Sequence, residues 1–332
     1  MTKEDYKGIW VFAEQQNGKL NNTVLEILAK AQELKAYNHE EITAVLLGKD
    51  VSALAGTLFS YGADKVILAE DDALSSYSAR PYEAALTQLA KKHKPSIILY
   101  GATSLGRDLA PRIMVTLNTG LTADAIDLGF DKDGVFYQTT PAYGGSILAH
   151  IVILEARPQM ATVRPMIFEP IEPRNNAAGE VIAETVDVVA DADYEVLSTA
   201  PKQDTGDSIE AASVIVAGGR GLKEESDLSQ LKELASLLGG QVAASRPLVD
   251  NNWLPHDRQI GQSGASVKPA YIFNIAISGS VQYQVGMQNS GCIISVNHTK
   301  GAPIFDISHY GVVADYKTVI PALVEEIRRR KN

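Results

Sequence analysis

The sequence predicts an α/β protein with two domains, each built on a largely parallel sheet with flanking helices. Two observations predict this class. Short apolar runs alternate with amphipathic helical stretches over residues 8–112, and the same alternation starts again at residue 212. A polar stretch at residues 200–208 separates the two series and has the composition of a linker. The chain of 332 residues is long enough for two cores, so we expect domains over 1–203 and 204–332.

Four apolar runs predict the parallel strands of the first domain. They are residues 8–13, 42–47, 66–68 and 97–100, with helices expected over 24–36, 51–61 and 82–92. Small residues at 101–106 then open another helix at a strand end, where ligands bind in such sheets. Arg107, near the start of that helix, either projects toward an anion or is a surface residue that pairs with Asp108 or faces solvent.

The pattern changes after residue 121. Residues 135–140, 146–154 and 159–164 have the character of strands separated by turn residues, and we expect them to be antiparallel additions to the first sheet. Two Arg-Pro pairs, at 157–158 and 164–165, indicate an extended edge. A further strand is predicted over residues 181–189.

Every expected strand of the second domain ends in small or polar residues. These ends are residues 218–221, 245–246, 278–280, 297–298 and 314–315. The ends of parallel strands meet at one edge of a sheet, so a nucleotide lying across that edge could contact all five. Arg220 would reach a diphosphate, and Asp315 would accept hydrogen bonds from a ribose or adenine. The alternative is a set of ordinary strand-to-helix turns.

Composition and charge exclude several classes of protein. The net charge of −10 argues against nucleic acid or an anionic membrane as the main partner. No apolar run approaches the roughly 18 residues that a membrane span needs, and the first residues have no secretory pattern. The single cysteine, Cys292, cannot form an internal disulfide, which fits a reducing compartment. We therefore expect a cytoplasmic protein.

Motifs for other chemistries are missing. The six histidines show no metal-ligand spacing, so no metal site is expected. Neither a nucleophile elbow nor a phosphate loop ending in Gly-Lys-Ser/Thr occurs. The Gly-x-Gly-x-x-Gly fingerprint is also absent from the second domain, which disfavours a nicotinamide site.

The second domain resembles the alpha subunit of electron transfer flavoproteins. The most specific part of the match is residues 271–297, which contain Ile277-Ser278-Gly279-x-Val281-Gln282 and end in Val296-Asn297. Further matching motifs stand at residues 218–221, 244–246, 260–264, 302–305 and 310–315. Their order and spacing match the family over residues 212–332, and the first half of the chain is similar to the family's less conserved first domain.

The resemblance implies a Rossmann-like FAD-binding C-terminal domain and a beta subunit that carries AMP or a second FAD. Carried over by motif, the expected FAD contacts are Arg220, Ser245, Arg246, Ile260, Gly261, Gln262, Ser263, Ser278, Gly279, Ser280, Val281, Gln282, Tyr283, Asn297, Asp315 and Tyr316. Three of them would tune the flavin without making bonds. Arg246 would pack over the isoalloxazine ring, the Ser263 hydroxyl would hydrogen-bond N5, and Tyr283 would lie nearby.

Two positions depart from the family pattern. Tyr283 stands where the family often has histidine, and a tyrosine at its usual pKa offers a neutral O–H where an imidazolium would hold negative charge. Ser263 stands where threonine is common, which keeps the hydroxyl and loses a methyl group. Both changes bear on the flavin potential, and neither threatens FAD binding.

The expected function is that of a redox carrier subunit, not of an enzyme by itself. The resemblance implies that the chain shuttles electrons between dehydrogenases, acyl-CoA dehydrogenases among them, and other redox partners. An alternative is a subunit of an electron-bifurcating flavoprotein that oxidises NADH. A remote alternative is an adenine-nucleotide-binding sensor, which the first domain alone would permit.

Overall fold

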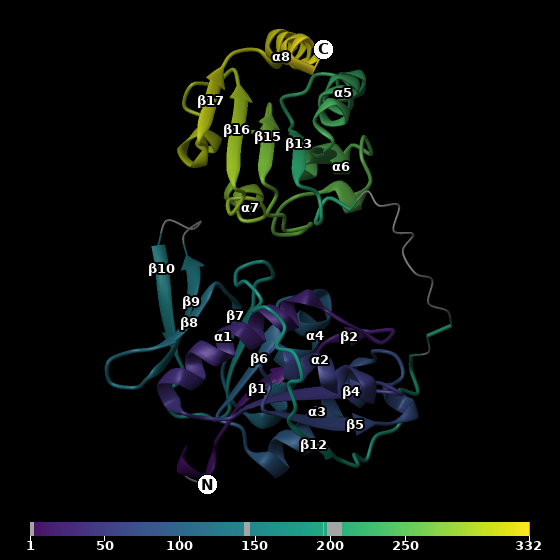
Figure 1. The fold of residues 1–332 in the computed structure, drawn as a ribbon, viewed down its shortest axis with the longest axis vertical. Coiled ribbons are helices and arrows are strands. Elements are labelled where there is room, and N and C mark those ends of the chain that lie inside the picture. The colour runs from purple at the N-terminus through teal and green to yellow at the C-terminus, as the bar shows by residue number, and fades with distance from the viewer. Residues whose placement is uncertain (1–2, 143–146, 195, 198–207, 332) are drawn as a thin grey trace. The chain divides into compact units, whose positions relative to one another are not determined.

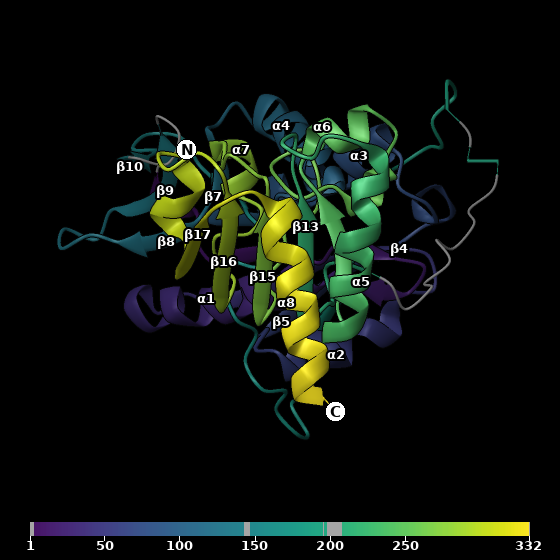
Figure 2. The same cartoon turned by 90° about the horizontal axis from the view of Figure 1, so that it is seen from above.

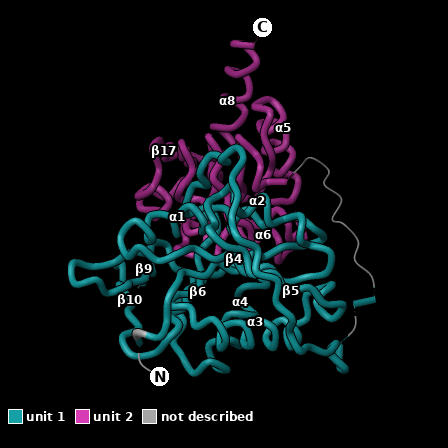
Figure 3. The backbone as a smooth tube through the Cα atoms, turned by 60° about the horizontal axis from the view of Figure 1, so that its bottom comes forward, with its two compact units in different colours: residues 1–199 teal, residues 200–332 magenta. Residues whose placement is uncertain are grey.

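The computed structural model describes residues 3–142, 147–194, 196–197 and 208–331 (Figure 1). The chain divides into two compact units, residues 1–199 and 200–332 (Figure 3). The predicted boundary at 203/204 and most of the predicted linker lie within 198–207, outside the described residues. Each unit contains its own parallel sheet with flanking helices, which confirms the predicted α/β class.

Unit 1 (residues 1–199) is built on a seven-stranded parallel sheet with the order β12-β5-β4-β1-β6-β11-β7. The strands are β1 (Ile9–Phe12), β4 (Ile42–Gly48), β5 (Lys65–Glu70), β6 (Ile97–Gly101), β7 (Leu121–Ala125), β11 (Gln159–Val163) and β12 (Glu180–Ala183). Helices α1 (Asn22–Asn38) and α2 (Ala55–Ser60) pack on one face, and α3 (Ala79–His93) and α4 (Ser104–Leu117) on the other. This double cover explains why β1, β4 and β6 are continuous apolar runs.

The strands after residue 121 differ from the prediction. Strands β9 (Phe136–Ala142) and β10 (Ile147–Val152) are antiparallel, but they form a separate sheet in which β9 pairs with both β10 and β8 (Asp127–Phe130). The expected antiparallel strand β11 is instead parallel and lies between β6 and β7, not at an edge. The Arg-Pro pairs flank β11 without interrupting it, so its N–H groups stay available to the ladder and all five of its residues are buried.

Two smaller elements complete unit 1. Residues 15–20 form a hairpin of β2 (Gln15–Gln16) and β3 (Lys19–Leu20) around Asn17 and Gly18, which both have positive φ. Only β12 forms within the strand predicted over 181–189, and it begins one residue earlier. None of the described helices of the chain combines the length and apolar content that a membrane span requires.

Unit 2 (residues 200–332) has a five-stranded parallel sheet with the order β14-β13-β15-β16-β17. The strands are β13 (Val214–Gly218), β14 (Gln241–Ala244), β15 (Tyr271–Ile275), β16 (Cys292–Asn297) and β17 (Tyr310–Val313). Helices α5 (Leu228–Leu238) and α8 (Tyr316–Lys331) pack side by side over one face, as Figure 2 shows. The short helices are α6 (Arg246–Asp250) and α7 (Val281–Gln284).

The strand order of unit 2 reverses at β13. The chain passes from β13 to β14 on one side and then crosses to β15, β16 and β17 on the other. The helices and loops that follow β13 and β15 therefore diverge at the carboxyl edge of the sheet. Such a reversal leaves a crevice at the carboxyl ends of the strands, and ligands of open α/β sheets bind there.

Candidate functional site

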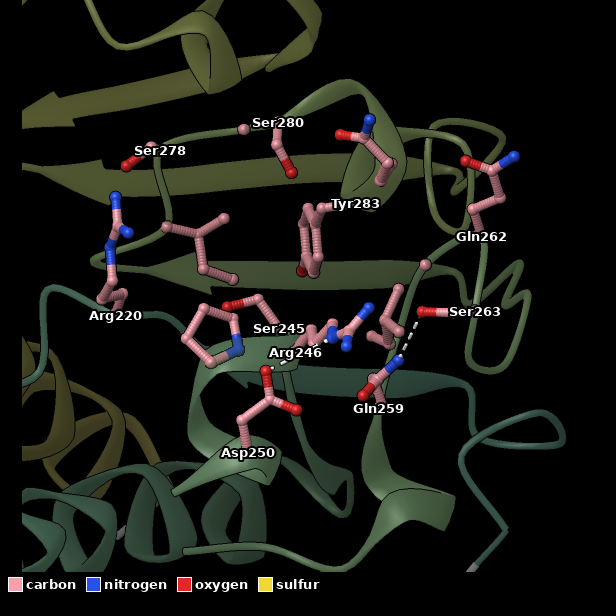
Figure 4. A pocket seen from close by; sticks show the side chains of 16 residues that line it. Arg220, Ser245, Arg246, Asp250, Gln259, Gln262, Ser263, Ser278, Ser280 and Tyr283 are labelled. Atoms are coloured by element: carbon pink, nitrogen blue, oxygen red, sulfur yellow. Dashed lines mark hydrogen bonds and ion pairs between the residues drawn. The ribbon is translucent and has the colours of Figure 1, made fainter. Parts of the chain in front are cut away.

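A cavity of about 560 Å³ lies at this reversal, between the segments that follow β13, β14 and β15 (Figure 4). Its volume is in the usual range for small-molecule sites. It is lined by Arg220, Ser245, Arg246, Pro247, Asp250, Gln259, Ile260, Gly261, Gln262, Ser263, Ile277, Ser278, Gly279, Ser280, Gln282 and Tyr283. We call it the unit 2 pocket.

Most of the residues predicted as FAD contacts come together in this pocket. The exceptions are Val281, Asn297, Asp315 and Tyr316. Four residues that sequence reasoning missed also line the pocket: Pro247, Asp250, Gln259 and Ile277. Each of these stands within four residues of a predicted contact, so the signal for them was proximity to the motifs.

Asn297 and Tyr316 stabilise the turns beside the pocket. Asn297 is buried, and its Nδ2 donates to the carbonyl oxygen of Ile277 at 2.9 Å. The Tyr316 hydroxyl donates to Asp227 Oδ2 at 2.6 Å and accepts from Lys223 N at 3.1 Å. The segments after three of the five strands, β13, β14 and β15, line the pocket. The end of β16 adjoins the pocket, because Asn297 bonds to Ile277 of the lining.

Glycines allow the turns after β13 and β15 to approach each other closely. A Cβ atom on Gly219 would stand 2.5 Å from the carbonyl oxygen of Ala276, a distance that no side chain tolerates. Gly279 has φ of +82°, and its Cβ would lie 2.4 Å from Ile304 N. Only glycine fits both positions, which explains the small residues at these strand ends.

Arg246 begins helix α6 directly after Ser245, the N-cap residue. Its Nε lies 3.3 Å from Asp250 Oδ2, one helical turn later, and its side chain is 67% exposed. An exposed pair of this kind contributes little to stability, so the guanidinium can be reoriented toward a bound anion at small cost. Figure 4 shows Arg220 at one end of the pocket and Ser263 at the other, with Arg246 between them.

The ring of Tyr283 borders the pocket, whereas its hydroxyl forms a hydrogen bond in the core. The side chain is 3% exposed, and the hydroxyl donates to Asn274 Oδ1 at 2.6 Å. Asn274 Nδ2 in turn donates to Ser295 Oγ at 3.2 Å, so the three side chains form one buried network. Burial raises the pKa of the Tyr283 phenol well above its ordinary value, which keeps it neutral.

The Ser263 hydroxyl remains able to donate. Its oxygen accepts a hydrogen bond from Gln259 Nε2 at 3.0 Å, and this orients the hydroxyl without using its proton. A hydrogen-bond donor is thus held at the end of the pocket opposite Arg220.

The donor set fits an anionic nucleotide, as the resemblance to flavoproteins requires. Among the described residues, two guanidinium groups and the hydroxyls of four serines line the pocket, and Asp250 is the single carboxylate. Arginine and clustered backbone or hydroxyl donors are the groups that bind diphosphates and carbonyl oxygens. Within the described residues of the chain, no group of three or more His, Cys, Asp or Glu side chains could hold a metal ion.

Comparison with known proteins identifies two family domains. Residues 9–190 match the electron transfer flavoprotein domain, and residues 208–288 match the electron transfer flavoprotein FAD-binding domain. The chain is 44% identical to the electron transfer flavoprotein subunit alpha of Thermoanaerobacterium thermosaccharolyticum, over 98% of this chain and 99% of that protein. It is 42% identical to the corresponding subunit of Megasphaera elsdenii, over 100% and 99% of the two chains. It is also 38% identical to the lactate dehydrogenase (NAD(+),ferredoxin) subunit LctC of Acetobacterium woodii, over 99% of this chain and 79% of that one.

Proposed function

Because the chain belongs to the electron transfer flavoprotein alpha-subunit family, we propose that it is the FAD-holding subunit of a heterodimeric electron carrier. The observation that carries this proposal is the unit 2 pocket. Two arginines and a set of serine hydroxyls line a cavity at the strand reversal, within the segment that matches the FAD-binding domain.

FAD would supply reversible acceptance of one or two electrons, and the residues of this chain would bind it and set its potential. We assign Arg220 and the hydroxyls of Ser278 and Ser280 to the diphosphate, because guanidinium and hydroxyl donors favour that group. Arg246 and Ser263 are assigned to the flavin ring, where reduction places negative charge. Asn297, Asp315 and Tyr316 would act by stabilising the neighbouring turns.

Arg246 is the group best suited to raise the flavin potential. Its guanidinium is permanently charged, and its ion pair with Asp250 is exposed to solvent. The guanidinium can therefore move toward a flavin ring that becomes negative on reduction. For a one-electron step, about 60 mV corresponds to about 1.4 kcal/mol of differential stabilisation. Tyr283, with a neutral buried phenol, contributes no charge and would act through the position of its ring.

The partner that the family implies is a beta subunit, and we propose that it carries AMP or a second FAD. We further propose that electrons pass to or from dehydrogenases, with acyl-CoA dehydrogenases as one class, and that the complex works in the cytoplasm without nucleic acid or membrane as a partner. The acidic net charge and the single cysteine support these last points.

A second candidate is a subunit of an electron-bifurcating complex. The observation that favours it is the relative from Acetobacterium woodii, whose name describes a lactate dehydrogenase that uses NAD(+) and ferredoxin. The two candidates differ in the cofactor content of the heterodimer. Two FAD molecules per heterodimer would support bifurcation, and one FAD with one AMP would support the simple carrier.

The proposal is tested by expressing the chain with its beta subunit and recording the visible spectrum during stepwise reduction. We expect a yellow heterodimer whose colour bleaches on reduction. A colourless, stably monomeric protein would refute the carrier and favour the adenine-nucleotide sensor. Extraction and quantification of FAD and AMP from the same sample separates the carrier from the bifurcating complex.

A further inference from the structure

A second cavity, of about 570 Å³, lies wholly within unit 1, and the proposed function does not use it. It is bordered by the segment after β1, the start of α4 after β6, and residues 75–77 before α3. The strand order of this sheet reverses between β1 and β6, which are parallel neighbours (Figure 1). The cavity therefore occupies the position where ligands of open α/β sheets bind. We call it the unit 1 pocket.

Glu14 links two helix caps at this pocket. Its Oε1 accepts a hydrogen bond from Asn21 Nδ2 at 3.2 Å, and its Oε2 accepts one from Thr103 Oγ1. Asn21 caps α1 by accepting from Thr23 N, and Thr103 caps α4 by accepting from Gly106 N. The carboxylate thus stands at the N-terminal ends of two helices, where a phosphate would otherwise be favoured.

The remaining lining is aromatic and neutral. Tyr77 and Tyr82 pack edge to face with ring centroids 5.1 Å apart, and the Tyr82 hydroxyl donates to the carbonyl oxygen of Leu74. Serine, threonine, glutamine and asparagine side chains supply most of the other lining groups. Among the residues that the structure describes, Glu14 is the only charged one that lines the cavity, so none of them supplies a cation to hold an anionic ligand.

We propose that the unit 1 pocket binds an uncharged nucleoside, with the base against the tyrosine rings and the ribose hydroxyls donating to Glu14. A flat aromatic base can pack against the rings of Tyr77 and Tyr82. The Glu14 carboxylate already accepts two hydrogen bonds, and its remaining lone pairs can accept two more from the vicinal hydroxyls of a ribose. A nucleotide is disfavoured because its phosphate would approach Glu14 without a neutralising cation.

The experiment is calorimetric titration of the full chain, loaded with FAD, with adenosine and separately with AMP. We expect adenosine to bind with an affinity about tenfold higher than that of AMP. Hydrogen–deuterium exchange should slow on adenosine addition at residues 14–21, 75–82 and 103–105, which would locate the ligand. Failure of adenosine to bind at millimolar concentration, or tighter binding of AMP at these segments, would overturn the proposal.

Three variants make the test specific. Ser76→Trp fills the cavity from an exposed position and should abolish adenosine binding, whereas Ser52→Trp, at an exposed serine outside the pocket, should leave it unchanged. Glu14→Gln should reduce the preference for adenosine over AMP to about twofold or less. Equal adenosine binding by Ser76→Trp and the parent chain would overturn the assignment. The comparison can also be made without FAD, so failure of the flavin proposal would be seen separately.

Discussion

The two pockets of this chain occupy the same place in two parallel sheets and have opposite electrostatic character. Both lie at the carboxyl edge where the strand order reverses, with volumes of about 560 and 570 Å³. The unit 2 pocket carries Arg220 and Arg246, whereas Glu14 is the only charged residue that lines the unit 1 pocket within the described part of the chain. The fold therefore sets the location of a site, and the loops that follow the strands set its chemistry.

The loops achieve this difference by different means. In unit 2, Gly219 and Gly279 let backbone segments approach closely, and the cationic side chains remain exposed to a ligand. In unit 1, the side chains of Asn21 and Thr103 cap their helices and also hold a carboxylate. The unit 2 pocket therefore leaves its positively charged groups available to an anionic ligand. In the unit 1 pocket, the Glu14 carboxylate already occupies the positive N-terminal ends of the helices.

The largest expected effect comes from Gly279→Val. The substitution places a branched side chain at φ of +82° with its Cβ 2.4 Å from Ile304 N, and it should destabilise the turn by about 3 kcal/mol. We expect loss of bound flavin, measured as the ratio of flavin to protein absorbance after purification. Gly301→Val is the matched control, because a Cβ at Gly301 meets nothing within 4 Å. Normal flavin content in the Gly279 variant would show that this turn does not form the site.

Tyr283→Phe and Tyr82→Phe compare the buried phenols of the two pockets. Removing the Tyr283 hydroxyl leaves Asn274 Oδ1 without its donor at a side chain that is fully buried, which should cost about 2 kcal/mol. Tyr82→Phe removes a hydrogen bond to a backbone carbonyl and should cost about 1 kcal/mol. Flavin release on heating should shift to lower temperature in the Tyr283 variant alone. An equal shift in both variants would mean that the units unfold together.

The smallest effect tests the charges of the two pockets directly. Arg246→Gln should lower the one-electron potential of bound flavin by about 60 mV, equivalent to about 1.4 kcal/mol. Asp250→Asn should raise it by about 20 mV, a smaller change because the Arg246–Asp250 pair is exposed to solvent. Glu14→Gln, in the other unit, is the control and should leave the potential unchanged. Spectroelectrochemical titration measures all three, and a potential insensitive to Arg246 would remove this residue from the flavin ring.

Much of the fold could be predicted from the order of apolar runs. The strands of unit 2 were all expected, since each is a short, mostly apolar run bounded by glycine or polar residues. Strand β11 was misassigned because its local pattern, between two Arg-Pro pairs, is that of an edge strand. Its true position between β6 and β7 depends on pairing with residues about 40 and 60 positions away, which no local pattern contains.

The site shows the same division. The residue types of the unit 2 pocket could be predicted from the sequence, because small residues, serines and arginines follow the strands in a characteristic order. Tyr283 was singled out for its difference from the family, but the structure directs its hydroxyl to Asn274 and away from the pocket. The unit 1 pocket was expected only in part. The small residues at 101–106 indicated a strand end where ligands bind, but Glu14 and Tyr77 lie in separate loops of ordinary composition.

The sequence by itself determined the fold class, the family and the chemical types of the groups that face the unit 2 pocket. These follow from periodicity and from motifs of adjacent residues, which are local properties of the chain. Only the tertiary structure decided which strand ends meet, which hydroxyls form hydrogen bonds in the core, as that of Tyr283 does, and that the Glu14 carboxylate lies in the unit 1 pocket. The physical reason is that strand order and burial arise from contacts between distant segments, and these contacts determine the charge that each pocket presents.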